Sequence, residues 1–256
     1  MTLTDHPAGN YRFMPGIAPY SCGVASAPGH EIAHVTLHRP APYPRGFDLI
    51  ESHLAAEGRP RTSLCGVELR SPRPYTFEGF SEFNAGYARV LEGWGLFVDG
   101  VNPVARTNVA PEVDPPSEPV LYGFSYARPC APSLPPTFLV AGAGELPEGV
   151  LAAGGIVRAG DTTPAGIAAK AEFVMDLMEA RLRGLGAEWS GVTAIDIYSI
   201  HPIGHVLPRV VLGRAAEASS HGVRLFFSRP PIEGIEYEMD VRGVRTELRI
   251  ESDRAG

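Results

Sequence analysis

The sequence has no apolar run of the length that a membrane-spanning helix requires. Its first residues carry no basic segment followed by an apolar one, so we expect neither a membrane anchor nor a signal peptide. Cysteine is scarce: Cys22, Cys65 and Cys130 are the three in the chain, and none forms a Cys-x-x-Cys pair. An odd number at such spacing is typical of reduced thiols, which predicts a cytoplasmic protein.

Positive charge is also in deficit, with 22 Lys and Arg against 29 Asp and Glu and a formal charge of -7. Nucleic acid is therefore not expected as a partner, because binding to phosphates needs clustered basic side chains. A phosphate-binding loop is absent too, since Gly142-Ala-Gly144 lacks the rest of that fingerprint. We expect a small molecule as the partner and no cofactor.

The histidines do not form a metal-binding pattern. His201 and His205 are four residues apart, but Pro202 and Gly204 interrupt the helix that such a ligand pair needs. A second group at positions 30, 34 and 38 falls on one face of a predicted strand, with no cysteine or carboxylate cluster beside it. We therefore predict that the protein has no metal site.

The first half of the chain shows alternating strand and helix patterns. Period-two alternation and β-branched residues predict strands over residues 17–24, 31–39, 64–70, 104–110 and 120–127. Apolar residues at helical spacing predict helices over residues 47–57 and 78–94. Residues 1–13 are polar and are expected to be a loose lead-in.

The same order recurs after residues 130–136, whose proline content is typical of a stiff linker. Strands are expected over residues 138–141, 154–158, 192–199, 223–228 and 235–241, with a helix from Pro164 and a weaker one over 205–219. The repetition predicts an α+β fold of two tandem domains, residues 14–129 and 137–250. Each would have a mixed sheet with two helices packed on one face.

Arg106 is the first candidate functional residue, in the segment Pro103-Val-Ala-Arg-Thr107. A guanidinium is a planar set of donors that holds a carboxylate through two hydrogen bonds. The alternative is a surface arginine in an edge-strand ion pair, since charged side chains are mostly exposed. A second arginine, Arg224, recurs at the equivalent place in the other half.

Several short motifs in both halves follow the order seen in one family. The matching segments are residues 18–21 (Ala-Pro-Tyr-Ser), 83–87 (Phe-Asn-Ala-Gly-Tyr), 103–107, 138–144, 223–224 and 235–238. Each half thus resembles a domain of the RidA (YjgF) family, which has a chorismate-mutase-like fold and forms trimers. The resemblance implies a homotrimer, whose ligands would lie in clefts between neighbouring domains.

The resemblance also implies roles for residues. Arg106 would hold the substrate carboxylate, with Tyr20 and Asn84 beside it, and Glu236 would position the attacking water. Arg224, Asn108 and Gly142 would contribute to substrate binding. The alternatives are a solvated strand glutamate for Glu236, a core aromatic for Tyr20 and a helix-surface residue for Asn84.

The activity implied is hydrolysis of a carboxylate-bearing enamine or imine, with release of ammonia. Substrates of the 2-aminomuconate type or the 2-aminoacrylate type suit such a site. Two alternatives remain open at this point: a chorismatase-like enzyme acting on a cyclic dicarboxylate, and a non-catalytic regulatory module that binds carboxylates. One fold can host all three.

Overall fold

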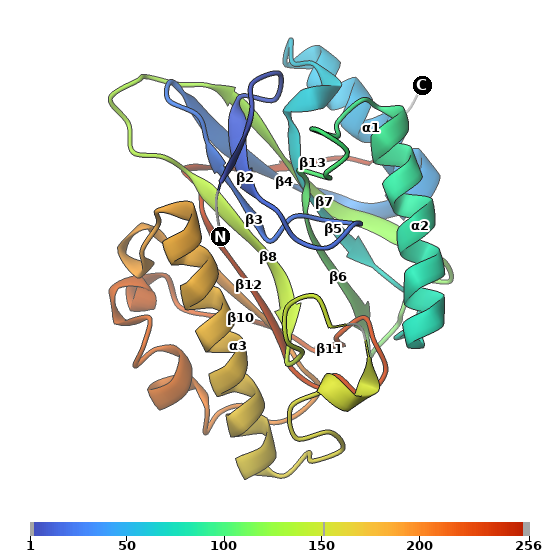
Figure 1. The fold of residues 1–256 in the computed structure, drawn as a ribbon, viewed down its shortest axis with the longest axis vertical. Coiled ribbons are helices and arrows are strands. Elements are labelled where there is room, and N and C mark those ends of the chain that lie inside the picture. Colours follow the sequence, from blue (N-terminus) through green and yellow to red (C-terminus); the bar gives the residue numbers. More distant parts are fainter. Residues whose placement is uncertain (1–2, 151, 253–256) are drawn as a thin grey trace.

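The computed structural model describes residues 3–150 and 152–252, and in it two β-sheets face each other with helices on their outer faces (Figure 1). The seven-stranded sheet has the order β1 (Thr4–His6), β2 (Tyr11–Met14), β3 (Gly23–Ser26), β8 (Phe138–Gly144), β12 (Glu238–Gly243), β9 (Ala194–Tyr198) and β10 (Arg224–Phe226). The six-stranded sheet has the order β11 (Ser228–Arg229), β6 (Ala105–Pro111), β5 (Leu64–Arg70), β7 (Val120–Pro129), β4 (His30–Pro42) and β13 (Thr246–Ile250).

Each sheet contains strands from both sides of the proline-rich segment at residues 130–136. In the seven-stranded sheet, β3 pairs with β8. In the six-stranded sheet, β11 pairs with β6, and β13 pairs in parallel with β4. The α+β class is confirmed, whereas the division into domains at residues 14–129 and 137–250 stays a prediction.

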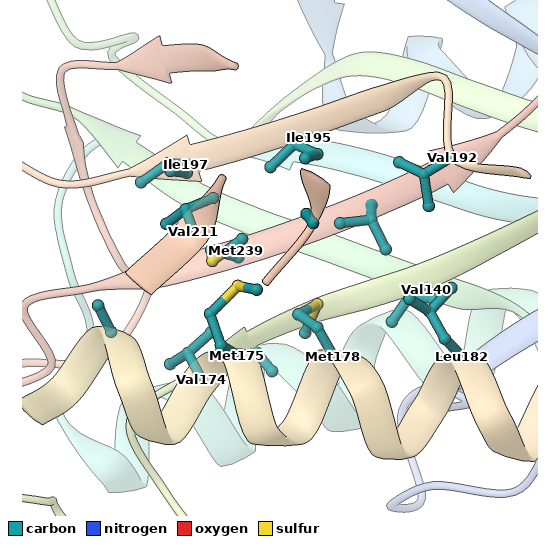
Figure 2. Close-up of a cluster of buried hydrophobic side chains, with 14 of the residues drawn as sticks. Val140, Val174, Met175, Met178, Leu182, Val192, Ile195, Ile197, Val211 and Met239 are labelled. Carbon is teal, nitrogen blue, oxygen red and sulfur yellow. The ribbon is translucent and has the colours of Figure 1, made fainter. Parts of the chain in front are cut away.

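Helix α3 (Pro164–Leu185) covers the outer face of the seven-stranded sheet. Thr163 caps its start by accepting a hydrogen bond from the Gly166 amide, and Gly186 ends it in the left-handed conformation with φ 70°. Figure 2 shows the apolar stripe of the helix against the sheet, with Met175 and Met178 facing strands β9 and β12. Since one face of β12 packs against α3, the side chains on its other face point toward the six-stranded sheet.

Helices α1 (Tyr43–Ala56) and α2 (Phe77–Gly93) cover the outer face of the six-stranded sheet (Figure 1). Aromatic rings join the two helices, since Phe47 lies edge-on to Trp94 at 5.2 Å and within 6.4 Å of Tyr87. Helices and the opposite sheet therefore cover the sheet faces within one chain. No uncovered sheet face therefore requires a second copy of the chain within the described residues, and the homotrimer stays a prediction.

Buried charges fill part of the space between the sheets. On β12, Met239 and Val241 pack toward α3, so the alternation directs Glu238, Asp240 and Arg242 toward the six-stranded sheet. All three side chains are buried. The side chains of Asp240 and Arg242 have polar partners on neighbouring strands of both sheets.

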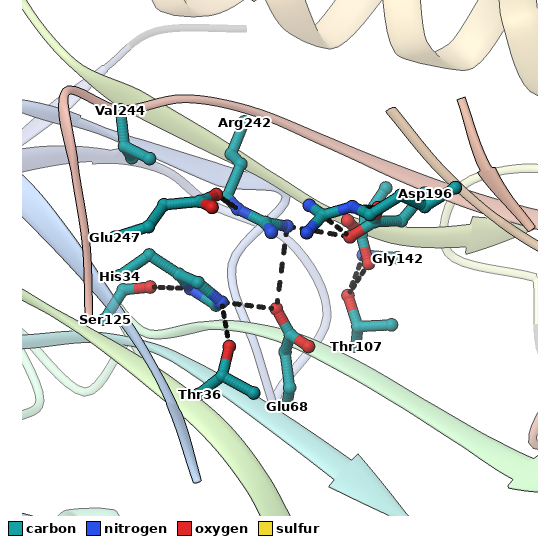
Figure 3. A network of polar contacts seen from close by, with 12 residues as sticks. His34, Thr36, Glu68, Thr107, Ser125, Gly142, Asp196, Arg242, Val244 and Glu247 are labelled. Atoms are coloured by element: carbon teal, nitrogen blue, oxygen red, sulfur yellow. Dashed lines mark hydrogen bonds and ion pairs between the residues drawn. The ribbon is translucent and has the colours of Figure 1, made fainter. Parts of the chain in front are cut away.

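Figure 3 shows this network. The Arg242 guanidinium lies 2.7 Å from the Asp196 carboxylate and 3.9 Å from that of Glu68. Thr107 donates a hydrogen bond of 2.8 Å to Asp240, which ties β6 to β12. Burial, reinforced by Asp196 and Glu68, raises the pKa of Asp240 to about 7.

Several expected elements differ from those observed. Residues 3–13 are not a loose lead-in, because β1 and β2 form a hairpin there, and residues 1–2 lie outside the described part of the chain. Residues 154–158 are not a strand, and a single 3₁₀ turn at Ala153–Gly155 stands in that region. The helix over 205–219 is replaced by a π-helical turn at Leu207–Val211 and a 3₁₀ segment at Ala216–His221, since Pro208 cannot donate a helical hydrogen bond.

Two further strands differ in extent. Most of residues 17–24 is a turn, and only its end enters β3. The strand expected over 223–228 is divided into β10 and β11, which belong to different sheets. In the described residues, no helix is both long and apolar enough to cross a membrane.

A fully buried ion pair joins α3 to Glu145, the residue that follows β8. Lys170 donates to the Glu145 carboxylate at 2.9 Å, and both side chains are completely buried. Glu145 also accepts hydrogen bonds from the amides of Glu236 and Tyr237 at 2.7 and 3.0 Å. Glu145 thereby fixes the path of the chain into β12.

Replacing Lys170 with Met should leave that carboxylate buried without its counter-charge, which costs about 3–5 kcal/mol of folding stability. Chemical denaturation monitored by circular dichroism measures the loss. Arg183→Met on the same helix is the matched control, because its pair with Glu179 spans 3.8 Å and Arg183 is 72% exposed. Its effect should stay below about 1 kcal/mol, and equal losses in the two variants would contradict the role of the buried pair.

Candidate functional site

A cavity of about 80 Å³ opens where β6 of one sheet meets β8 and β12 of the other. This volume holds several water molecules. Its polar lining comes from both halves of the chain: Tyr20, Arg106, Asn108, Glu148, Arg181 and Glu238. Residues of both halves therefore line the cavity, but Glu236, the carboxylate expected to share it with Arg106, is not among them. The shared catalytic site stays a prediction.

Arg106 is a buried cation in this cavity, with 3% of its surface exposed. Its guanidinium carbon lies 4.6 Å from the ring centre of Tyr20 and 4.8 Å from that of Tyr87. Among the described residues its Nη1 has no hydrogen-bond partner. A buried guanidinium held by aromatic faces, with a donor unused, is suited to bind an anion.

Tyr20 is held in place by a segment that runs beside the start of β6. The Ser21 amide donates to the Val104 carbonyl at 3.0 Å, and the Asn102 side chain donates to the Pro19 carbonyl at 2.7 Å. These bonds flank Tyr20 on both sides in the sequence. The ring is thereby fixed over the guanidinium, and burial raises the pKa of its hydroxyl.

Glu238 is the first residue of β12 and supplies a buried carboxyl to the cavity. Burial raises its pKa well above the usual value, and Asp240 raises it further, while the positive charge of Arg106 opposes the shift. The net effect favours the protonated acid. A carboxyl that keeps its proton in a cleft is able to act as a general acid.

Gly142 makes room for that carboxyl. A Cβ at this position would overlap Glu238 Oε1 and press on the Thr107 side chain at 3.1 Å. The Gly142 amide donates to Thr107 Oγ1 at 3.1 Å, which binds β8 to β6. Glycine is thus needed here for a close approach and not for its backbone angles.

Asn108 provides a second unused donor. Its Oδ1 accepts a hydrogen bond of 2.9 Å from Ser71, while its Nδ2 is buried without a partner in the part of the chain that the structure describes. Asn108 and Arg106 lie on the same face of β6 and both line the cavity. Two donors thus converge on one space.

Three other predicted residues do not line the cavity. Glu236 precedes β12 and its carboxylate lies 2.7 Å from His201 Nε2. Arg224 sits on the edge strand β10, is 46% exposed and pairs with Asp196 at 2.6 Å. Asn84 is buried within α2. The predicted pairing of Arg106 with Glu236 is therefore corrected to one of Arg106 with Glu238.

Three polar residues of the cavity, Glu148, Arg181 and Glu238, were not anticipated, although the sequence holds a signal for the last two. Glu238, Asp240 and Arg242 alternate with apolar residues, which indicates a charged strand face. Arg181 falls within the apolar stripe of α3, next to Leu182, where an arginine is buried only with partners. Within the described ranges, no group of three or more His, Cys, Asp and Glu side chains is arranged to hold a metal ion.

The fold is similar to that of a chorismatase known from a crystal structure. The two superpose with a TM-score of 0.53 at 10% sequence identity, over 95% of this chain and 89% of the other. At this identity the likeness shows a shared fold and nothing of the reaction. The α+β architecture with two facing sheets is thus that of chorismatase.

The sequence itself defines the family. Residues 3–248 match the family of the 2-aminomuconate deaminase CnbZ. A 2-amino-5-chloromuconate deaminase from Comamonas testosteroni is 43% identical over 243 residues, which span 92% of this chain and 94% of the relative. The chain belongs to the CnbZ 2-aminomuconate deaminase family. These comparisons do not support the assignment to the RidA (YjgF) family.

The space at Gly142 is open to test. Gly142→Ala should force Glu238 and Thr107 apart and cost about 1–3 kcal/mol of stability, as overpacking does. Gly86→Ala in α2 is the control, because a Cβ there meets only an Arg89 atom at 3.9 Å. Thermal unfolding should show the loss in the first variant alone, and an unchanged Tm in Gly142→Ala would contradict the close contact.

Proposed function

We propose that this chain is a 2-aminomuconate-type deaminase that hydrolyses a carboxylate-bearing enamine and releases ammonia. The observation that carries the proposal is a buried arginine with an unused donor in the same cavity as a buried carboxyl, whose pKa burial raises. Membership of the CnbZ family and the 43% identical relative, named for its action on 2-amino-5-chloromuconate, support it.

Binding of the substrate needs a positive charge and hydrogen-bond donors. Arg106 would hold the carboxylate next to the amino-bearing carbon, and the Asn108 amide would donate to the same group. The surrounding rings of Tyr20 and Phe80 would cover the apolar carbon chain. The reactive carbon is then placed against Glu238, so that the reaction proceeds without a search for orientation.

The proton transfers follow from the state of Glu238. Its acid form protonates the carbon of the C=C bond that does not carry the nitrogen. This step leaves an iminium and a Glu238 carboxylate. That carboxylate takes a proton from water as the water oxygen bonds to the iminium carbon. Glu238 passes this proton to the nitrogen, the C–N bond breaks, and the hydroxyl returns its proton to Glu238. One water is consumed and one ammonia released, with a keto acid as the product.

Two nearby arginines assist the reaction steps in which Glu238 is a carboxylate. Arg106 and Arg181 both lower the pKa of Glu238, although burial prevails. They therefore stabilise its carboxylate form during the interval when the proton is on the substrate. The same residue can serve as acid and then as base because its environment opposes neither form completely.

The role of Glu238 is tested by Glu238→Gln, which keeps the size of the side chain and removes its acidity. We expect kcat for ammonia release from freshly generated 2-aminomuconate to fall by about 100-fold or more. Glu236→Gln, two residues away and outside the cavity, is the matched control and should stay within a few-fold of the wild type. The opposite ranking of the two variants would sink the assignment.

The pH dependence of the rate gives a second test of Glu238. The pKa of Glu238 is raised, so its acid form persists above the usual range for a glutamate and is lost as the pH rises through that pKa. The wild-type rate should fall over this interval, and Glu236→Gln should show the same fall. A binding module without catalysis would release no ammonia at any pH, while still being stabilised by its ligand.

Arg106→Lys tests the carboxylate clamp, because lysine keeps the charge but loses the two-pronged geometry. We expect kcat/KM to fall about 10- to 100-fold, in line with the loss of one charge-assisted hydrogen bond. Arg224→Lys changes the exposed pair with Asp196 and should leave kcat/KM unchanged. Wild-type kinetics in Arg106→Lys would remove this arginine from the mechanism.

A further inference from the structure

Arg181 is a second cation in the same cavity. It lies on α3, and its side chain is 4% exposed. Nε donates to the Glu148 carboxylate at 2.8 Å, and Nη1 donates to the Ala141 carbonyl at 2.8 Å. Nη2 makes no hydrogen bond to any residue that the structure describes. The guanidinium is therefore anchored by the backbone and still able to donate.

Glu148, the partner of Arg181, is less firmly held. It lies in the connection between β8 and α3, and its side chain is 32% exposed. Its other oxygen is approached by the Cys22 thiol at 3.7 Å, a weak contact. Because this carboxylate is already partly hydrated, its ion pair with Arg181 contributes less than a fully buried pair, and water can replace that partner at small cost.

Arg181 and Arg106 act on the same groups. Both line the same cavity, and both lower the pKa of Tyr20 and of Glu238. Arg106 comes from β6 in the first half of the chain, and Arg181 from α3 in the second. A monocarboxylate requires one of these cations. A substrate with a carboxylate at each end can use both.

We propose that Arg181 binds the second carboxylate of a dicarboxylate substrate and that Glu148 is the exchangeable counter-ion that occupies this position in the empty site. The inference rests on the proposed function for the nature of the substrate. Exchange of one carboxylate for another keeps the buried guanidinium paired throughout, so no uncompensated charge arises. The Ala141 carbonyl keeps Arg181 in position while its partner changes.

The exchange makes Arg181 a specificity-determining residue. A monocarboxylate has no charged group at the end that faces Arg181. It therefore leaves Glu148 in place and gains no binding free energy at Arg181. A dicarboxylate gains charge-assisted hydrogen bonds, including one to the free Nη2. Selection between the two substrate types expected from the sequence, 2-aminomuconate and 2-aminoacrylate, would thus lie in α3 and not in the Arg106 clamp.

Two unreactive probes of the same carbon skeleton test the inference by binding alone. trans,trans-Muconate carries a carboxylate at each end, and sorbate carries one. Calorimetric titration of the wild type should give a Kd for muconate about tenfold or more below that for sorbate. Arg181→Gln should abolish this preference by weakening muconate binding, with the Kd of sorbate unchanged.

Glu148→Gln moves the result in the opposite direction. Loss of the competing carboxylate should tighten muconate binding several-fold and leave sorbate binding unchanged. Arg106→Gln should weaken both probes, since both use that clamp. If Arg181→Gln fails to fold, as judged by its Tm, Glu148→Gln decides the question with the cation still in place.

Equal affinities for the two probes in the wild type would overturn the inference. A muconate preference that survives in Arg181→Gln, or weaker muconate binding in Glu148→Gln, would also overturn it. The proposed function fails in a different way, through absence of ammonia release from 2-aminomuconate by a protein that still prefers muconate. The two failures are therefore distinguishable.

Discussion

Charges buried between the two sheets constrain the rest of this structure. Arg242, Asp196 and Asp240 are removed from water and Glu68 is largely so, and such groups are tolerated only when they neutralise and hydrogen-bond one another. The network fixes the spacing of β12 against β5 and β6. Burial raises the pKa of Asp240 within this network, and the neighbouring carboxylates of Asp196 and Glu68 raise it further.

The cavity lies at one end of this charged layer. Glu238 continues the same face of β12, but its pKa shows that burial outweighs the nearby arginines and the carboxyl keeps its proton. Arg106 presents the reverse case, a buried cation whose neighbours are aromatic rings instead of carboxylates. The cavity therefore contains a carboxyl with a raised pKa, that of Glu238, and a cation with an unused hydrogen-bond donor, that of Arg106.

The sequence predicted the elements with strong periodicity well. The strand over Leu64–Arg70 is observed with those bounds, and the helices at α2 and α3 begin within a residue of expectation. The sequence did not predict which strands pair, because alternation shows which side chains share a face of a strand but not which strand lies beside it. That limit explains why β3 with β8, and β4 with β13, were not foreseen.

The site was predicted in part for the same reason. Arg106, Tyr20, Asn108 and Gly142 line the cavity as expected. Glu236 was preferred to Glu238 because a motif gives the order of residues, and the turn before β12 decides which of them enters the strand. The prediction of a 2-aminomuconate-type deaminase is confirmed at the level of the family, although the motifs were assigned to a different one.

The parallel pairing of β13 with β4 has a consequence for biosynthesis. Thr246 lies opposite Ala33, so the six-stranded sheet gains β13 only after residues 246–250 have been translated, more than 200 residues after β4. Until then β4 is an open edge, able to pair with a strand of another molecule. Contacts of such sequence separation also slow folding, since a long loop must close before they form. Aggregation during synthesis should therefore depend on how soon β13 pairs with β4.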